Sequence, residues 1–288
     1  MGNSNLKKAE TGALISILAY VILSAFKLLM GYLGNSEALK ADGLNNLTDI
    51  MASLAVFIGL RISQKPPDEN HRYGHSRAET IASLVAAFIM ISVGIQVIKG
   101  SVEAFFNPDD TTPDIITALV ALVSALFMYG IYRYNLKLSK SLNSKSLYSA
   151  AQDNRSDALV SVGAAIGITG SYFGIGWLDP LTAGIVGFII CYTAWEIFKD
   201  AALDLTDAFE VSKLNEIEET IRNTPGVKLV KDIKARLHGN RAIVDATIFV
   251  EPTLTVIEGH QIAEEVEDRL LENHQINDST IHIEPQMG

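Results

Sequence analysis

Two acidic side chains and an amide stand inside a stretch that is otherwise apolar enough to cross a bilayer. Residues 36–64 contain Asp42, Asn45 and Asp49 well away from both ends. A carboxylate in hydrocarbon costs ~3 kcal/mol even on insertion scales, so such a residue usually lines a polar cavity or binds a ligand. Asn45 and Asp49 are four residues apart and therefore share one helix face. Together they can provide part of a cation site.

A second polar pair with the same spacing provides the remaining ligands. Asp153 and Asp157 are also four residues apart, and the letters DNRSD at 153–157 resemble NNLTD at 45–49. An internal repeat in two membrane helices often marks a binding site between them. The alternative is that small polar residues only hydrogen-bond one helix to another. That reading does not account for three carboxylates, so the spacing favours a cation site.

Six segments are long enough to cross the hydrocarbon, which takes ~20 residues. They are residues 12–33, 37–63, 78–105, 114–138, 146–172 and 179–202. Lys and Arg gather before the first segment and in the second-to-third and fourth-to-fifth connections, whereas the other loops have none. This bias predicts that both termini are cytoplasmic. At ~1.5 Å per residue, the two polar pairs enter from opposite sides and meet near the middle.

Smaller features have ordinary structural explanations. Asp179 and Pro180 are expected to begin the last segment, with the aspartate as its cap. Lys27 lies inside the first segment and is expected to extend to the interface or to pair with a neighbour. The tyrosines near segment ends and Trp177 are expected to anchor the chain at the membrane surface.

Residues 208–288 are charged and predict a soluble α+β domain, after a transmembrane domain at 1–207. An amphipathic helix that ends at Pro225-Gly226 is followed by two alternating strands around Gly239-Asn240. A second helix at 255–273 and a strand at 279–285 complete the order αββαβ. This order suggests helices packed on one face of a sheet. The fold class is therefore an all-α six-helix transmembrane bundle followed by an α+β domain.

Composition excludes several classes of protein. The chain has 288 residues, a net charge of −10 and one cysteine, Cys191, so an intrachain disulfide is impossible. The acidic balance gives no support for nucleic-acid binding. Neither a nucleotide-binding loop nor a nucleophile motif is present, so we expect no enzyme activity and no bound cofactor.

These features together resemble the cation diffusion facilitators. The resemblance rests on six spans, the motifs Asn45-x3-Asp49 and Asp153-x3-Asp157, the loop HRYGHSRAE, the run GNSEALKADGLNNLTD and the C-terminal αββαβ order. It covers residues 10–285. It implies a homodimer in the cell membrane that exports divalent metal ions in exchange for protons. It also implies a ferredoxin- or metallochaperone-like cytosolic domain, and a transport site formed by Asn45, Asp49, Asp153 and Asp157.

The ligand set departs from the family's zinc pattern. Zinc members carry histidine at one or both positions matching Asn45 and Asp153, whereas all four side chains here offer oxygen. Zinc prefers nitrogen and sulfur, while carboxylate, carbonyl and water suit manganese. The resemblance is therefore to the manganese branch. Zn²⁺ or Fe²⁺ as the cargo remains an alternative, and so does a metal-sensing scaffold without transport. Oxygen ligands also do not exclude calcium or magnesium.

Further positions match metal sites of some relatives. Asp68, His71 and His75 lie in the second-to-third loop, where Gly74 and two prolines predict a turn; a solvated loop is the alternative. The C-terminal domain has five such positions, with a polar surface as the alternative: His238, Asp245, His260, His282 and Glu284. In this domain Thr247 stands where relatives often place a histidine. The resemblance also implies that Arg77 and Asp207 form a charge pair at the dimer's membrane–cytosol junction.

Overall fold

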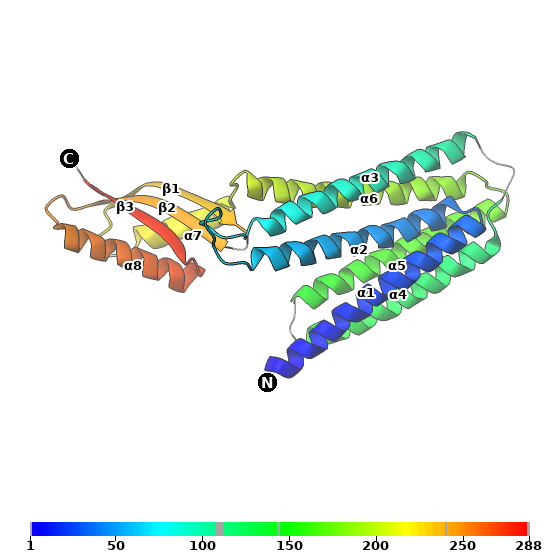
Figure 1. The fold of residues 1–288 in the computed structure, drawn as a ribbon, viewed down its shortest axis with the longest axis horizontal. Helices are drawn as coiled ribbons and strands as arrows, with labels where there is room; N and C mark the ends of the chain where they lie inside the picture. Colours follow the sequence, from blue (N-terminus) through cyan, green and yellow to red (C-terminus); the bar gives the residue numbers. More distant parts are fainter. Residues whose placement is uncertain (1, 108–111, 143–144, 240, 287–288) are drawn as a thin grey trace. The chain divides into compact units, whose positions relative to one another are not determined.

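The computed structural model describes residues 2–107, 112–142, 145–239 and 241–286, which form eight helices and three strands (Figure 1). Six long helices come first. They are α1 (Gly2–Leu33), α2 (Glu37–Ser63), α3 (Ala78–Phe106), α4 (Ile115–Leu142), α5 (Lys145–Tyr172) and α6 (Leu178–Leu205). The C-terminal elements are α7 (Val211–Arg222), β1 (Leu229–His238), β2 (Arg241–Val250), α8 (Val256–His274) and β3 (Asp278–Pro285).

The long helices agree with the expected segments to within a few residues, except at the beginning of α1. This helix starts at Gly2, ten residues before the predicted apolar span, because no proline interrupts the polar residues that precede it. Among the described residues, α2, α3, α4 and α6 each contain a stretch long and apolar enough to cross a membrane. The described apolar part of α1 is shorter, at Leu18–Leu33. The helical region is therefore that of a multi-pass membrane protein.

The chain forms two compact units, and the first contains residues 1–55 and 85–197. Its interior consists of three apolar clusters, each shared by three helices. One cluster joins α1, α4 and α5, a second joins α2, α4 and α5, and a third joins α2, α3 and α6. Alanine is frequent in all three clusters, and small residues let helix backbones approach closely in membranes. Both α2 and α5, which carry the polar pairs, lie within this packing.

Close approach between α1 and α2 occurs at Gly43. A Cβ atom at this position would lie 2.9 Å from Cγ of Leu28, so only glycine fits without a shift. The Ser24 hydroxyl donates a hydrogen bond of 2.9 Å to the Gly43 carbonyl oxygen. The contact places the middle of α1 directly against the part of α2 that carries Asp42 and Asn45.

The expectation that Asp179 caps its own helix is wrong. Helix α6 begins one residue earlier, at Leu178, and the Asp179 carboxylate instead accepts hydrogen bonds at the start of α2. The donors are the Ser36 hydroxyl and the Glu37 backbone N–H, both at 2.7 Å, and the Ala38 N–H at 3.4 Å. The first N–H groups of a helix have no partner within it, so a carboxylate from another helix can satisfy them.

The second unit contains residues 56–84 and 198–288 and includes the predicted αββαβ order. Its sheet has the order β1-β2-β3, with β1 and β2 antiparallel and β2 and β3 parallel. Helix α8 is the crossover between the parallel strands, as such a pair requires. Alternate β2 side chains from Val244 to Val250 are buried against α7 and α8, in a core that includes Ile221, Val266 and Leu270.

Local signals fix the ends of these elements. Thr255 caps α8 and forms a capping box with Glu258, whose carboxylate accepts from the Thr255 N–H at 2.8 Å. In the predicted hairpin, Gly239 has a φ of +63°, a left-handed conformation that glycine adopts without strain. Its neighbour Asn240 lies outside the described residues.

Candidate metal centre

Asp157 on α5 is buried, and both of its carboxylate oxygens accept hydrogen bonds from other helices. The Asn45 side-chain amide on α2 donates to Oδ1 at 3.0 Å. The Tyr20 hydroxyl on α1 donates to Oδ2 at 2.6 Å. The structure therefore brings Asn45 and Asp157, which are 112 residues apart in sequence, into direct contact.

The other two predicted ligands flank this contact. Asp49 lies one turn after Asn45, and its Oδ2 is buried without a hydrogen-bond partner among the described residues. Asp153 lies one turn before Asp157, and its side chain is exposed. The three carboxylates interact electrostatically with one another. We call Asn45, Asp49, Asp153 and Asp157, the four residues of the predicted transport site, the transport cluster.

A buried lysine lies next to the transport cluster. The Lys27 ammonium group donates to Asp42 Oδ1 at 2.9 Å, to Asn46 Oδ1 at 2.7 Å and to the Ser161 hydroxyl at 2.9 Å. All four side chains, here called the lysine network, are fully buried. Of the two expectations for Lys27, pairing is correct and extension to the interface is wrong. The network connects α1 to α2 and α5 through the hydrogen bonds of Lys27. Separating these helices would leave a buried ammonium group unpaired, which costs free energy.

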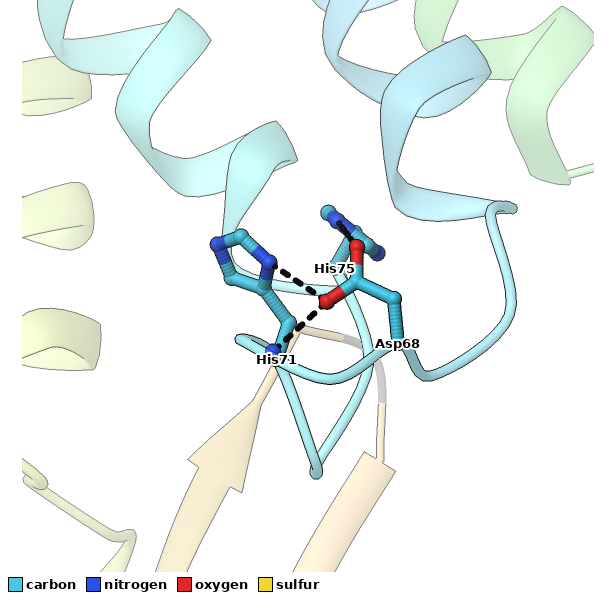
Figure 2. A group of neighbouring side chains, drawn as sticks. All are labelled: Asp68, His71 and His75. Atoms are coloured by element: carbon cyan, nitrogen blue, oxygen red, sulfur yellow. Dashed lines mark hydrogen bonds and ion pairs between the residues drawn. The ribbon is translucent and has the colours of Figure 1, made fainter.

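The predicted loop ligands form a compact group, here called the loop trio (Figure 2). One ligand atom from each of Asp68, His71 and His75 can be chosen so that all lie within 4.8 Å of one another. Asp68 Oδ1 lies 3.0 Å from His71 Nδ1, and Asp68 Oδ2 lies 3.3 Å from His75 Nε2. No other group of three His, Cys, Asp or Glu residues reaches this spacing within the described ranges.

The loop backbone positions the trio. Asp68 Oδ1 accepts from the His71 N–H at 2.7 Å and the Asn70 N–H at 3.0 Å. These bonds, the one from His71 first, hold the pKa of the Asp68 carboxyl below its usual range. The chain turns at Gly74, where φ is +83°, as the glycine and prolines predict. Asp68 therefore stays ionised and available to a cation in mildly acidic solution.

Among the described residues, no three of the five predicted C-terminal positions bring ligand atoms within 4.8 Å of one another, although His282 Nε2 lies 3.8 Å from Glu284 Oε1. His282 and Glu284 share the sheet face opposite the core, as their alternation predicts, and His282 is in register with Thr247. Both Glu284 oxygens bind the Lys231 ammonium group, at 2.7 and 2.8 Å. Asp245 pairs with Arg236 at 3.1 Å. His260 lies on α8 beside Glu264, at 3.4 Å.

His238 is in a positively charged environment. Burial, and then the charges of Arg77, Arg236 and Arg241, lower its pKa. The same charges disfavour a metal cation at this imidazole. The ring instead lies 6.1 Å from that of Tyr73 in the second-to-third loop.

The predicted charge pair is present. Arg77 Nη2 lies 2.6 Å from Asp207 Oδ1, with both side chains partly exposed. The pair joins the residue before α3 to the second residue after the end of α6.

Two residues near the transport cluster were missed at the sequence level. The sequence patterns do not single out Tyr20, although its position in the middle of the 12–33 segment indicates a buried hydroxyl that needs a partner. Asp42 was noted as a membrane carboxylate without its partner, Lys27. Both residues contact groups more than ten positions away, which periodicity cannot reveal.

The transport cluster presents an amide and three carboxylates on two helices, of which Asn45 and Asp157 are in direct contact, whereas its three carboxylates do not reach the 4.8 Å spacing of the loop trio. Amide and carboxylate oxygens are hard ligands, suited to Mn²⁺, Mg²⁺ or Ca²⁺. The loop trio adds two imidazoles, which also suit zinc and other transition metals.

Two family profiles match consecutive parts of the chain. Residues 13–206 match the profile of the cation efflux transmembrane domain, and residues 210–286 match that of the cytoplasmic domain of cation efflux proteins. The manganese efflux system protein MneS of Bacillus subtilis is 53% identical over 251 residues, which are 87% of each chain. The uncharacterized transporter YdbO of the same organism is 54% identical, over 88% of this chain and 87% of its own.

A further relative from Bacillus subtilis, the manganese efflux system protein MneP, is 30% identical over 85% of this chain and 84% of its own. The first profile alone covers more than half of the sequence. The chain therefore belongs to the cation efflux family, the cation diffusion facilitators.

Proposed function

We propose that this protein exports Mn²⁺ from the cytoplasm in exchange for protons. The observation that carries the proposal is the ligand set of the transport cluster, in which every side chain offers oxygen and neither nitrogen nor sulfur is available as a ligand. Manganese binds less tightly than zinc at most sites, so selectivity has to come from ligand type and geometry. Two relatives named as manganese efflux proteins support this choice of ion.

The proposed architecture is a homodimer with six spans per chain. Residues 1–207 would form the transport domain and residues 208–288 the cytosolic domain, with both termini on the cytoplasmic side of the cell membrane. The loop charges support this orientation. The match to the cytoplasmic domain of cation efflux proteins supports the location of the C-terminal part.

Proton exchange follows from the charges of the transport cluster. Asp49, Asp153 and Asp157 are close enough to interact electrostatically, and like charges near one another oppose simultaneous ionisation. Either a dication or protons can relieve that repulsion. Metal binding would then displace protons, and proton binding on the far side would release the metal.

The loop trio and the C-terminal residues Asp245, His260, His282 and Glu284 are proposed as regulatory metal positions. They lie outside the membrane segments that carry the transport cluster, and no three of the C-terminal positions bring ligand atoms within 4.8 Å of one another in the part of the chain that the structure describes. A second protomer could complete such a site. Substitution of His260 and His282 by alanine should therefore change how flux depends on cytosolic metal without abolishing it.

Reconstitution tests the proposal directly. The purified full-length protein is placed in liposomes, a pH gradient is imposed, and uptake of Mn²⁺, Zn²⁺, Fe²⁺, Co²⁺ and Cd²⁺ is measured. We expect Mn²⁺ uptake to be fastest and to move protons in the opposite direction. Faster Zn²⁺ or Fe²⁺ uptake would support the alternative cargo. Binding without uptake of any ion would support a sensor, and Mn²⁺ flux independent of the gradient would exclude exchange.

A further inference from the structure

The Tyr20 hydroxyl is hydrogen-bonded to one of the two carboxylate oxygens of Asp157, a proposed transport ligand. It donates to Asp157 Oδ2 at 2.6 Å, while Asn45 donates to Oδ1 at 3.0 Å. The hydroxyl also lies 3.1 Å from Asn154 Oδ1. It has a single proton, which goes to the carboxylate because that acceptor is closer and charged. Asp157 is thus held from two sides, by α1 and by α2.

Packing fixes the position of the phenol ring. Tyr20 lies against a buried cluster formed by Ala19 and Leu23 of α1, Met128 and Ile131 of α4, and Ala158 of α5. Ala158 directly follows Asp157 in sequence. A ring anchored on three helices cannot follow the carboxylate freely if the carboxylate rotates. The hydroxyl therefore restrains the orientation of Asp157.

Asn45 and Tyr20 differ in how they can respond when a cation binds to Asp157. Asn45 can turn its amide so that the carbonyl oxygen faces the metal, which frees Asp157 Oδ1 and adds a ligand in one step. The Tyr20 phenol has no second polar group to present to the metal. Its hydroxyl can remain hydrogen-bonded to Oδ2 of Asp157 while Oδ1 binds the metal. Hydrogen bonds of this kind orient metal-binding carboxylates in many proteins.

We propose that Tyr20 is a positioning residue that makes Asp157 bind the cation through Oδ1 alone and thereby disfavours Ca²⁺. The inference rests on the proposed function, because it takes Asp157 as a transport ligand. Ca²⁺ takes six to eight oxygens and often binds both oxygens of a carboxylate. Manganese suits octahedral oxygen sites, in which one oxygen per carboxylate leaves room for water. Blocking Oδ2 therefore penalises the larger ion more than the smaller one.

The test compares Ca²⁺ and Mn²⁺ binding to two tyrosine variants of the purified full-length protein. Tyr20→Phe removes the hydroxyl, and Tyr32→Phe removes an exposed hydroxyl from the same helix as a matched control. Dissociation constants for both ions are measured by titration calorimetry, and the binding step assigned to the transport cluster is the one absent from Asp157→Ala. In Tyr20→Phe the ratio of the Ca²⁺ constant to the Mn²⁺ constant should fall about tenfold, which corresponds to ~1.4 kcal/mol. In Tyr32→Phe it should not change.

A general structural role for Tyr20 would weaken both ions alike and leave the ratio unchanged, and that result would overturn the proposal. Asp157→Ala distinguishes a failure of the proposed transport site from a failure of the role proposed for Tyr20. If it binds both ions as the unaltered protein does, the transport cluster itself is misassigned. If Asp157→Ala loses binding but Tyr20→Phe keeps the ratio, only the role of Tyr20 fails.

A spectroscopic measurement keeps the proposal testable if Tyr20→Phe does not fold. Metal-induced infrared difference spectra distinguish a carboxylate that binds through one oxygen from one that binds through two, by the separation of its two stretching bands. The Asp157 bands are those absent from Asp157→Ala. In the Mn²⁺-bound unaltered protein they should have the wide separation of one-oxygen binding. A two-oxygen signature would overturn the proposal.

Discussion

The transport cluster and the loop trio differ in how their ligands are held. The transport cluster is shared between α2 and α5, and the buried Asp157 carboxylate accepts hydrogen bonds from protein donors at both oxygens. The loop trio comes from eight consecutive residues, and Asp68 and His71 are exposed to water. A cation at the first must replace hydrogen bonds between helices, whereas one at the second replaces water. Binding at the transport cluster is thus coupled to helix arrangement, and binding at the loop trio is not.

The largest expected effect is the loss of a transport ligand. Asp157→Ala should abolish Mn²⁺ uptake by proteoliposomes, because the buried transport contact with Asn45 depends on this carboxylate. Asp268→Ala, which removes an exposed carboxylate from α8, is the control and should transport normally. If a folded, monodisperse Asp157→Ala protein takes up Mn²⁺ at the rate of the unaltered protein, the transport cluster is not the transport site and does not differ from the loop trio in function.

The lysine network should be the most sensitive feature for stability. Lys27→Met leaves the fully buried Asp42 without its ammonium partner, and such a change typically costs ~3–5 kcal/mol. Reversible unfolding in mixed micelles measures the loss. Adding Asp42→Asn removes the second charge and should recover part of the stability. If the double variant is no more stable than Lys27→Met, the unpaired charge is not the cause.

Much of the fold could be predicted because it depends on local patterns. Long apolar runs define α2, α3 and α6 to within a few residues, and alternation along 231–251 and 279–285 gives the strands. The spacing of Asn45, Asp49, Asp153 and Asp157 placed two pairs on helix faces. Their depth predicted that the pairs meet, and the Asn45–Asp157 contact agrees with that.

The remaining features depend on partners that are distant in sequence. Asp179 caps α2 rather than α6, across more than 140 residues. Tyr20 and Asp157 are 137 residues apart, and Lys27 and Ser161 are 134 apart. Periodicity shows which face of a helix is polar, but it does not show which neighbour that face meets. The only sequence signal for these contacts was a charged or hydroxyl side chain inside an apolar run, because such a side chain needs a partner when it is buried.

Exchange of ligand type at the transport cluster should change ion preference. Asn45→Asp with Asp153→His gives three carboxylates and one imidazole, a set that favours zinc. The Zn²⁺-to-Mn²⁺ flux ratio should rise about tenfold, for which ~1.4 kcal/mol of differential binding suffices. Both ions are measured on the same proteoliposomes. An unchanged ratio in an active variant would mean that selectivity lies outside these two positions.

The loop trio should bind metal in a pH-dependent way without controlling transport. An imidazole binds a metal ion only in its neutral form, so affinity should fall as the pH falls. Because the pKa of Asp68 is held below its usual range, this carboxylate stays ionised throughout and does not set the midpoint. Zn²⁺ titrations in a background with Asp157→Ala, His260→Ala and His282→Ala isolate the loop. Asp68→Asn should weaken binding and leave the midpoint in place; a shifted midpoint would show that Asp68 itself titrates there.

The smallest effect is expected at the ion pair of Arg77 and Asp207. This pair is partly exposed, whereas the pair of Lys27 and Asp42 is fully buried. The 2.6 Å separation of Arg77 and Asp207 is shorter than the 2.9 Å of Lys27 and Asp42, yet both side chains are partly exposed. Water already solvates such charges, so the pair should contribute no more than ~1 kcal/mol. Asp207→Asn is the suitable change, because Asp207 has a φ of +60° and asparagine tolerates this conformation. Its unfolding free energy should be nearly unchanged, and a loss as large as that of Lys27→Met would show that exposure does not decide the strength of these pairs.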